Sequence, residues 1–282
     1  MTELAESPLR GVAREAALEV ARNARDPLDS CEQLLGMAKL YSEPSLRAEA
    51  IEFFRMLPDD IEKGLFALPK MNRVCPIAGR LIGEALIAGD QTEVDVMRTH
   101  LARVMGGPPP DRIRSMSGSR KTSRIRWCGL TALEAAQTID SEAAMQRLDD
   151  LLEQWHLRPT RTDRGVAEYD SLVRAEAHAP IYQEIFQKSC ELGLLSRVSE
   201  MARITTARFH DAQVRYGDGQ EELLPQDLLE QSLGTLIDKM IADAEDEDKI
   251  RDTLTAIFRL ASNNDMKHRL LQSAETALEG RT

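Results

Sequence analysis

The chain has 282 residues, of which 42% are hydrophobic, 29% charged and 4% aromatic, and its formal net charge is -11. This length can bury a core without disulfides or metal, and the scarcity of aromatic residues favours helices over sheets. The negative charge argues against a general nucleic-acid binder, because its field repels phosphates. We therefore predict an all-α protein in which any anion-binding site is local.

Prolines and capping residues mark the expected helix starts in the first hundred residues. Helices are predicted to begin at Pro8, Pro27, Pro44, Pro58, Val74 and Asp90. Gly89 suits the end of the helix that starts at Val74, because glycine adopts the left-handed conformation common after a helix. Successive starts are therefore 14 to 19 residues apart.

This spacing gives helix pairs of 30 to 36 residues, the scale of stacked antiparallel hairpins of the TPR or HEAT type. The tetratricopeptide sequence pattern does not recur in successive units. An irregular globular helical domain predicts similar helix lengths, so both interpretations stay open. In total we predict an array of about thirteen antiparallel helices without a sheet.

Beyond residue 123 the helical pattern resumes. Helices are predicted over 141–155, 166–178, 180–192, 195–214, 223–244, 246–262 and 263–280. The break before Pro180 is expected because proline lacks an N–H donor and disfavours helical geometry in the residue before it. We divide the chain into an N-terminal helical half (1–106), a basic linker rich in Gly, Pro and Ser (107–122), and a C-terminal helical half (123–282).

The segment from Gly106 to Gly129 carries six basic residues and one acidic residue. Small and apolar residues continue one helical face back to Ile125, which predicts an N-cap at Thr122 or Ser123. Cations at a helix N-terminus are unfavourable unless an anion offsets them, so this end is a candidate cradle for phosphate or carboxylate. Trp127 is expected off the core face, either exposed or packed on a neighbour.

A second arginine-rich loop is expected at the same end of the array, because alternate connections in an up-down array emerge together. The candidate residues for binding an anion or a partner are Arg112, Arg114, Ser119, Arg120, Lys121, Thr122, Ser123, Arg124, Arg126, Arg158, Arg161 and Arg164.

The leading functional interpretation is a non-enzymatic scaffold, adaptor or assembly subunit that binds a protein partner with an acidic patch. Arrays of helix hairpins expose long grooves, and the sequence supplies no convincing nucleophile, base or metal set. No catalytic residue and no cofactor are predicted. The alternative is a module that binds an anion, a phosphate ligand or nucleic acid through the basic stretch 112–126.

A third interpretation is a metal phosphohydrolase of the His…His-Asp…Asp kind. His178, the pair His210 and Asp211, and Asp238 or Asp265 occur in that order, and such groups can converge on a divalent metal that activates water. The apolar row of the predicted helix turns Asp211 toward water, which argues against this interpretation.

The cysteines and the N-terminus predict a cytoplasmic protein. Cys31, Cys75, Cys128 and Cys190 are each more than forty residues apart, which is typical of buried thiols in a reducing compartment. The N-terminus has no signal-peptide core, and nowhere do eighteen apolar residues run together, so we expect no membrane segment.

Overall fold

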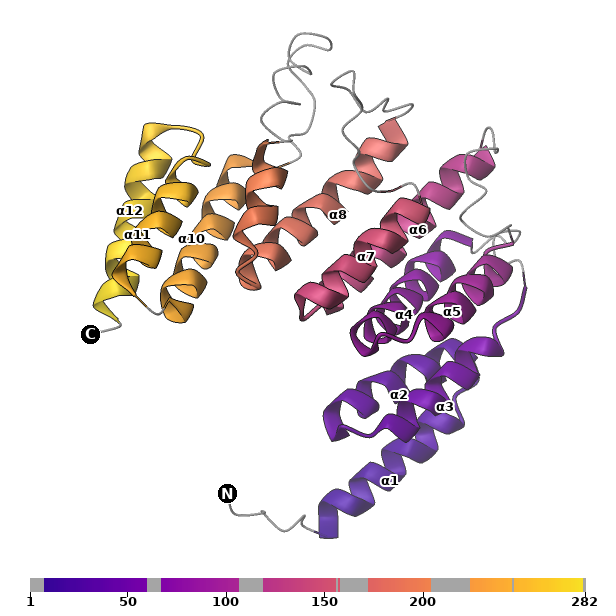
Figure 1. The fold of residues 1–282 in the computed structure, drawn as a ribbon. Coiled ribbons are helices and arrows are strands. Elements are labelled where there is room, and N and C mark those ends of the chain that lie inside the picture. Colours follow the sequence, from indigo (N-terminus) through magenta and orange to yellow (C-terminus); the bar gives the residue numbers. More distant parts are fainter. Residues whose placement is uncertain are drawn as a thin grey trace.

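The chain is folded as a curved row of α-helices (Figure 1). The structure is a computed structural model that describes residues 8–59, 67–106, 119–155, 157, 172–203, 224–244 and 246–280. These residues form helices and no strand, which confirms the predicted all-α class. Within the same ranges, no helix combines the length and the apolar character needed to cross a membrane.

The helices of the described ranges are α1 (Pro8–Arg22), α2 (Pro27–Tyr41), α3 (Pro44–Arg55), α4 (Ala67–Ala88), α5 (Gln91–Val104), α6 (Ser119–Thr138), α7 (Glu142–Gln154), α8 (Leu172–Glu191), α10 (Gln226–Asp243), α11 (Glu247–Phe258) and α12 (Asn264–Glu279), with a further helical segment over 195–203.

Local capping sets several helix starts at the predicted residues. The Asp26 side chain accepts a hydrogen bond from the Leu28 N–H (3.0 Å), and Asp90 accepts one from the Glu93 N–H (2.9 Å). Gly89 lies between α4 and α5 with a φ of 71°, a backbone conformation that glycine adopts without steric cost. These starts depend on contacts within a few residues, which is why the sequence indicates them correctly.

Two helices are longer than predicted, because both run through a proline. α4 begins at Ala67 instead of Val74 and contains Pro76, and α8 continues through Pro180, where a break was predicted. A proline inside a helix costs about 3 kcal/mol. Burial of neighbouring side chains offsets this cost, since Val74 and Ile181 are both buried in the core.

The even-numbered helices form one continuous layer. Helices α2, α4, α6, α8, α10 and α12 each contact the next in the series. α3, α5, α7 and α11 each pack against the even-numbered helix that precedes them, as the second helix of a hairpin. Assignment of these hairpins to a TPR-like or HEAT-like repeat stays a prediction, as does the division of the chain into halves around 107–122.

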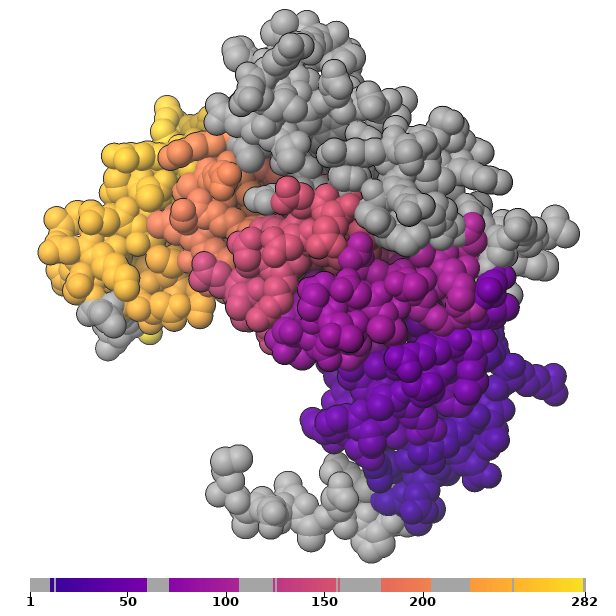
Figure 2. Space-filling model, turned by 45° about the vertical axis from the view of Figure 1, so that its right-hand side comes forward, coloured from indigo at the N-terminus to yellow at the C-terminus, as the bar shows by residue number. Residues whose placement is uncertain are grey.

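The row of helices bends into an arc. Figure 2 shows the N-terminal helices, in indigo, and the C-terminal helices, in yellow, on the two sides of a hollow. The buried hydrophobic residues form one cluster that extends from Leu18 of α1 to Ala274 of α12. A continuous core therefore joins the two arms of the arc.

Two glycines set the separation of α4 and α6. A Cβ atom at Gly79 would lie 2.3 Å from the backbone oxygen of Thr131, and one at Gly83 would lie 2.7 Å from the Cβ of Thr138. Cβ atoms in proteins essentially never make contacts shorter than 3.0 Å, so these positions admit no side chain unless their neighbours shift. The α4–α6 junction is therefore close-packed, backbone against backbone.

Candidate functional site

The basic stretch is helical earlier than the sequence predicted. α6 begins at Ser119, so the predicted N-cap at Thr122 or Ser123 is wrong by about one turn. Arginine and lysine favour helices almost as strongly as alanine, so Arg120 and Lys121 extend the helix beyond its apolar face. Five candidates lie outside the described residues, namely Arg112, Arg114, Arg158, Arg161 and Arg164.

Arg124 and Trp127 are both buried in the structure. Arg124 is only 3% exposed, and its guanidinium carbon lies 5.7 Å from the centre of the Trp127 ring, within cation–π distance. Trp127 was expected off the core face of α6, either exposed or packed on a neighbour. Helix α6 contacts α4, α7 and α8, so more than one face of this helix is covered, and Trp127 is buried there. Arg126 is exposed, and its predicted role in anion binding stays a prediction.

The phosphohydrolase set is only partly described. His178 belongs to α8, Asp238 to α10 and Asp265 to the first turn of α12, whereas His210 and Asp211 lie outside the described residues. In the part of the chain that the structure describes, no group of three or more His, Cys, Asp or Glu side chains is placed to hold a metal ion.

His100 of α5 has a structural environment that the sequence did not indicate. Its Nε2 lies 2.7 Å from the carbonyl oxygen of Phe54 at the end of α3, and its ring packs against the Phe54 ring. Arg103 donates to the carbonyl oxygen of Leu57 nearby. Burial lowers the pKa of His100. The histidine therefore ties α5 to α3, through partners 46 residues away in the sequence.

The four cysteines are buried and free, as predicted. Burial raises the pKa of Cys31, Cys75 and Cys190 to about 12, and it raises the pKa of Cys128 well above the ordinary value. Nucleophilic cysteines need the thiolate form at neutral pH, which requires a low pKa. These thiols therefore serve as small core side chains.

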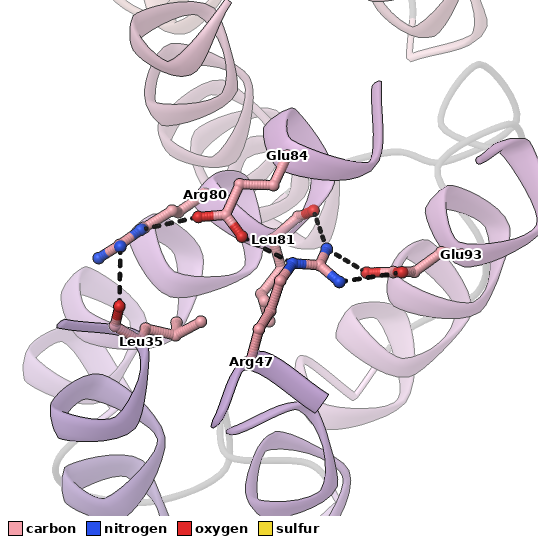
Figure 3. A network of polar contacts seen from close by, with 6 residues as sticks. All are labelled: Leu35, Arg47, Arg80, Leu81, Glu84 and Glu93. Atoms are coloured by element: carbon pink, nitrogen blue, oxygen red, sulfur yellow. Dashed lines mark hydrogen bonds and ion pairs between the residues drawn. The ribbon is translucent and has the colours of Figure 1, made fainter. Parts of the chain in front are cut away.

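A polar network joins α3, α4 and α5 around Arg47 (Figure 3). The Arg47 Nε donates to Glu84 of α4 (2.8 Å), and its Nη1 donates to Glu93 of α5 (3.1 Å). Arg80 of α4 donates to the same Glu84 and to the carbonyl oxygen of Leu35 at 3.0 Å. In these partly buried ion pairs the charges of the arginines and glutamates compensate one another. We therefore assign the network a structural role and not ligand binding.

An open groove lies between α10 and α12, with a volume of about 680 Å³. Such a volume is within the range of ligand-binding sites. Its lining is polar and comes from both helices, as follows: Asp227, Glu230, Gln231, Gly234, Thr235, Asp238, Arg269, Leu270 and Ser273.

Charge is unevenly balanced in this groove. Arg269 donates to both carboxylate oxygens of Glu230, at 2.5 and 2.6 Å, and these hydrogen bonds lower the pKa of Glu230. In the described part of the chain, neither Asp227 nor Asp238 forms a side-chain hydrogen bond or a close ion pair, although Asp227 interacts electrostatically with Arg269. Three carboxylates against one guanidinium leave two uncompensated negative charges in the groove.

The sequence alone did not single out this groove. Glu230 and Arg269 are 39 residues apart, and charged residues on a helix are ordinary on an exposed face. The sequence suggested Asp238 only as a candidate metal ligand. No local sequence signal indicated the contact between α10 and α12. No protein-family model, curated protein or solved structure matches the chain.

Proposed function

We propose that the protein is a non-enzymatic cytoplasmic scaffold that binds a polypeptide partner along the outer face of α1. The supporting observation is an uncovered apolar row, formed by Val12, Ala16 and Val20 at four-residue spacing. Val12 and Val20 are 66% and 65% exposed, whereas Leu18 and Ala21, on the other side of α1, are buried. Residues at this spacing share one helix face, so α1 presents two apolar faces and only one is covered.

Other exposed apolar side chains lie in the same third of the chain. Leu40 and Tyr41 at the end of α2 and Met56 after α3 are also exposed. Exposed apolar surface on a folded protein is typical of interaction sites. A helix face with an apolar row suits a partner helix that contributes a matching row.

Charge next to the row favours a particular kind of partner. Glu15 and Glu19 are exposed and lie beside the row at helical spacing. In a symmetric antiparallel pairing of two α1 helices these carboxylates would face their own copies and repel. A different polypeptide, with basic residues beside its apolar row, fits the α1 face better than a second copy of this chain, whereas the acidic patch expected of a partner at the basic stretch 112–126 stays a prediction.

The test is affinity purification of the tagged protein from its native cells after mild crosslinking. We expect a polypeptide partner to co-purify, and the pair of changes Val12→Asp and Val20→Asp to reduce its recovery at least tenfold. Both side chains project into solvent, so the fold is expected to change in stability by no more than about 0.5 kcal/mol. Circular dichroism checks this.

Leu271→Asp provides the matched control. Leu271 is an exposed apolar residue of α12, at the opposite end of the helical array from α1. This variant should retain the partner. Retention of the partner by the α1 double variant would exclude the α1 face as the binding site. Purification without any polypeptide partner would contradict the scaffold function itself.

A further inference from the structure

We propose that the groove between α10 and α12 binds an extended basic peptide. This inference rests on the proposed scaffold function and deepens it, by naming a class of partner and a surface separate from α1. The groove supplies a defined volume of about 680 Å³, in contrast to the flat exterior of a single helix. The groove is open to solvent and lined by both helices, so a peptide segment can enter it from outside and lie between α10 and α12.

The charges of the groove select a cationic ligand. Arg269 is paired with Glu230 and also interacts electrostatically with Asp227, so the groove keeps a net charge of two negatives, carried by Asp227 and Asp238. These two residues are eleven positions apart on α10, which corresponds to about three turns and a rise of about 16 Å on nearly the same face. Two cationic groups must therefore be separated by a similar length to engage both carboxylates.

An extended peptide meets this requirement with Lys or Arg residues four positions apart. Such residues point to the same side of the peptide, and their backbones are about 13 Å apart. The flexible arginine side chains supply the remaining few ångströms. Adjacent arginines carry the same charge, but in an extended peptide they project to opposite sides, so that only one of them points toward the groove.

Gly234 lies between the two carboxylates and keeps the groove open. A Cβ added there would meet only Ser273 Oγ, at 3.8 Å, which is ordinary van der Waals contact. Packing of α10 against α12 therefore does not require glycine, in contrast to Gly79 in α4. A glycine inside a helix costs about 1 kcal/mol relative to alanine. The absent side chain leaves space for the backbone of a bound peptide.

The experiment measures binding of two fluorescent nine-residue peptides to the full chain by anisotropy at low salt. Both peptides have a Gly/Ser/Ala background and two arginines, at positions 3 and 7 in one and at 3 and 4 in the other. We expect the spaced peptide to bind about tenfold more tightly, and its affinity to fall as salt screens the charges. Equal affinities would overturn the proposal, because they would show unspecific attraction to an acidic protein.

Three variants locate the site. Asp227→Asn with Asp238→Asn should weaken binding of the spaced peptide about tenfold, and Gly234→Leu should do the same by filling the groove. Asp252→Asn with Glu275→Gln removes the same charge from exposed positions that do not line the groove, so it should bind normally. Undiminished binding by the groove variants, or equal loss in the control, would refute the site. Because the peptides are synthetic, this result is independent of any partner at α1.

Discussion

The centre of the row and its C-terminal end use the same arrangement of helices in opposite ways. α4 packs on α6 with the backbones in contact at Gly79 and Gly83, whereas α10 packs on α12 across an open polar groove that contains Gly234. At the centre a glycine is needed because no atom fits in its place. At the end a glycine leaves space unused by the fold. The same residue type therefore indicates close packing in one junction and a vacant surface in the other.

The largest expected change in stability is that caused by Gly79→Ala. The new Cβ would lie 2.3 Å from the backbone oxygen of Thr131, and a backbone atom cannot move aside alone, so α4 and α6 must separate. We expect a loss of about 3 kcal/mol in the free energy of unfolding, measured by urea denaturation.

Gly36→Ala in α2 is the matched control, because a Cβ at Gly36 meets no atom within 4 Å. It should stabilise the protein by about 0.5–1 kcal/mol through helix propensity. A neutral effect of Gly79→Ala would mean that the α4–α6 contact is looser than described.

The second effect concerns the ion pairs of the two regions. Arg47→Met should cost about 2 kcal/mol, because partly buried Glu93 loses its guanidinium partner and the Leu81 carbonyl loses a donor. Arg269→Met removes an equally bidentate pair with Glu230, but Arg269 is exposed, and the loss should be clearly smaller. Thermal unfolding of both variants gives the comparison, and equal losses would remove the distinction between centre and end.

The third effect is that of Gly234→Ala, the counterpart of the change at Gly79. The methyl group would fit, so the helix propensity of alanine should stabilise the protein by about 0.5–1 kcal/mol. Opposite signs at Gly79 and Gly234 in the same denaturation assay would confirm the contrast between the two junctions. A destabilised Gly234→Ala variant would show that the groove is closed in solution.

The smallest effects are those of two carboxylates with opposite pKa shifts. Burial raises the pKa of Glu134 in α6, so its ionised form weakens the fold above that pKa, and the penalty disappears as the pH falls below about 4.5. Glu134→Gln should therefore stabilise the protein at pH 7 by a few tenths of a kcal/mol, after discounting for solvent screening.

The pKa of Glu230 is shifted in the opposite direction. The hydrogen bonds from Arg269 lower its pKa, so it contributes stability at neutral pH that is lost as the pH falls through the lowered pKa. Glu230→Gln should accordingly destabilise at pH 7. Denaturation curves at pH 7 and pH 3 test both changes, and the difference of each variant from the parent protein should shrink at pH 3. If both variants changed the stability in the same direction at pH 7, the environments assigned to Glu134 and Glu230 would be contradicted.

The sequence predicts those features that depend on near neighbours. The starts of α2 and α5 follow from Asp26 and Asp90, whose partners are two and three residues away. Pro180 is a local signal that failed, since core contacts around α8 offset a cost that the local sequence cannot weigh. The sequence could not predict the groove for the same reason, because the groove forms only where α10 meets α12.

The single row of neighbouring contacts also determines how the protein comes apart. Because the even-numbered helices from α4 to α12 are joined through contacts between successive members, stability is a local quantity that varies along the chain. α12 has a neighbour in this layer on one side only, next to an open groove, whereas α6 is clamped between α4 and α8. The array is therefore expected to open first at its ends, so that a partner bound in the groove would raise the stability of the α12 end.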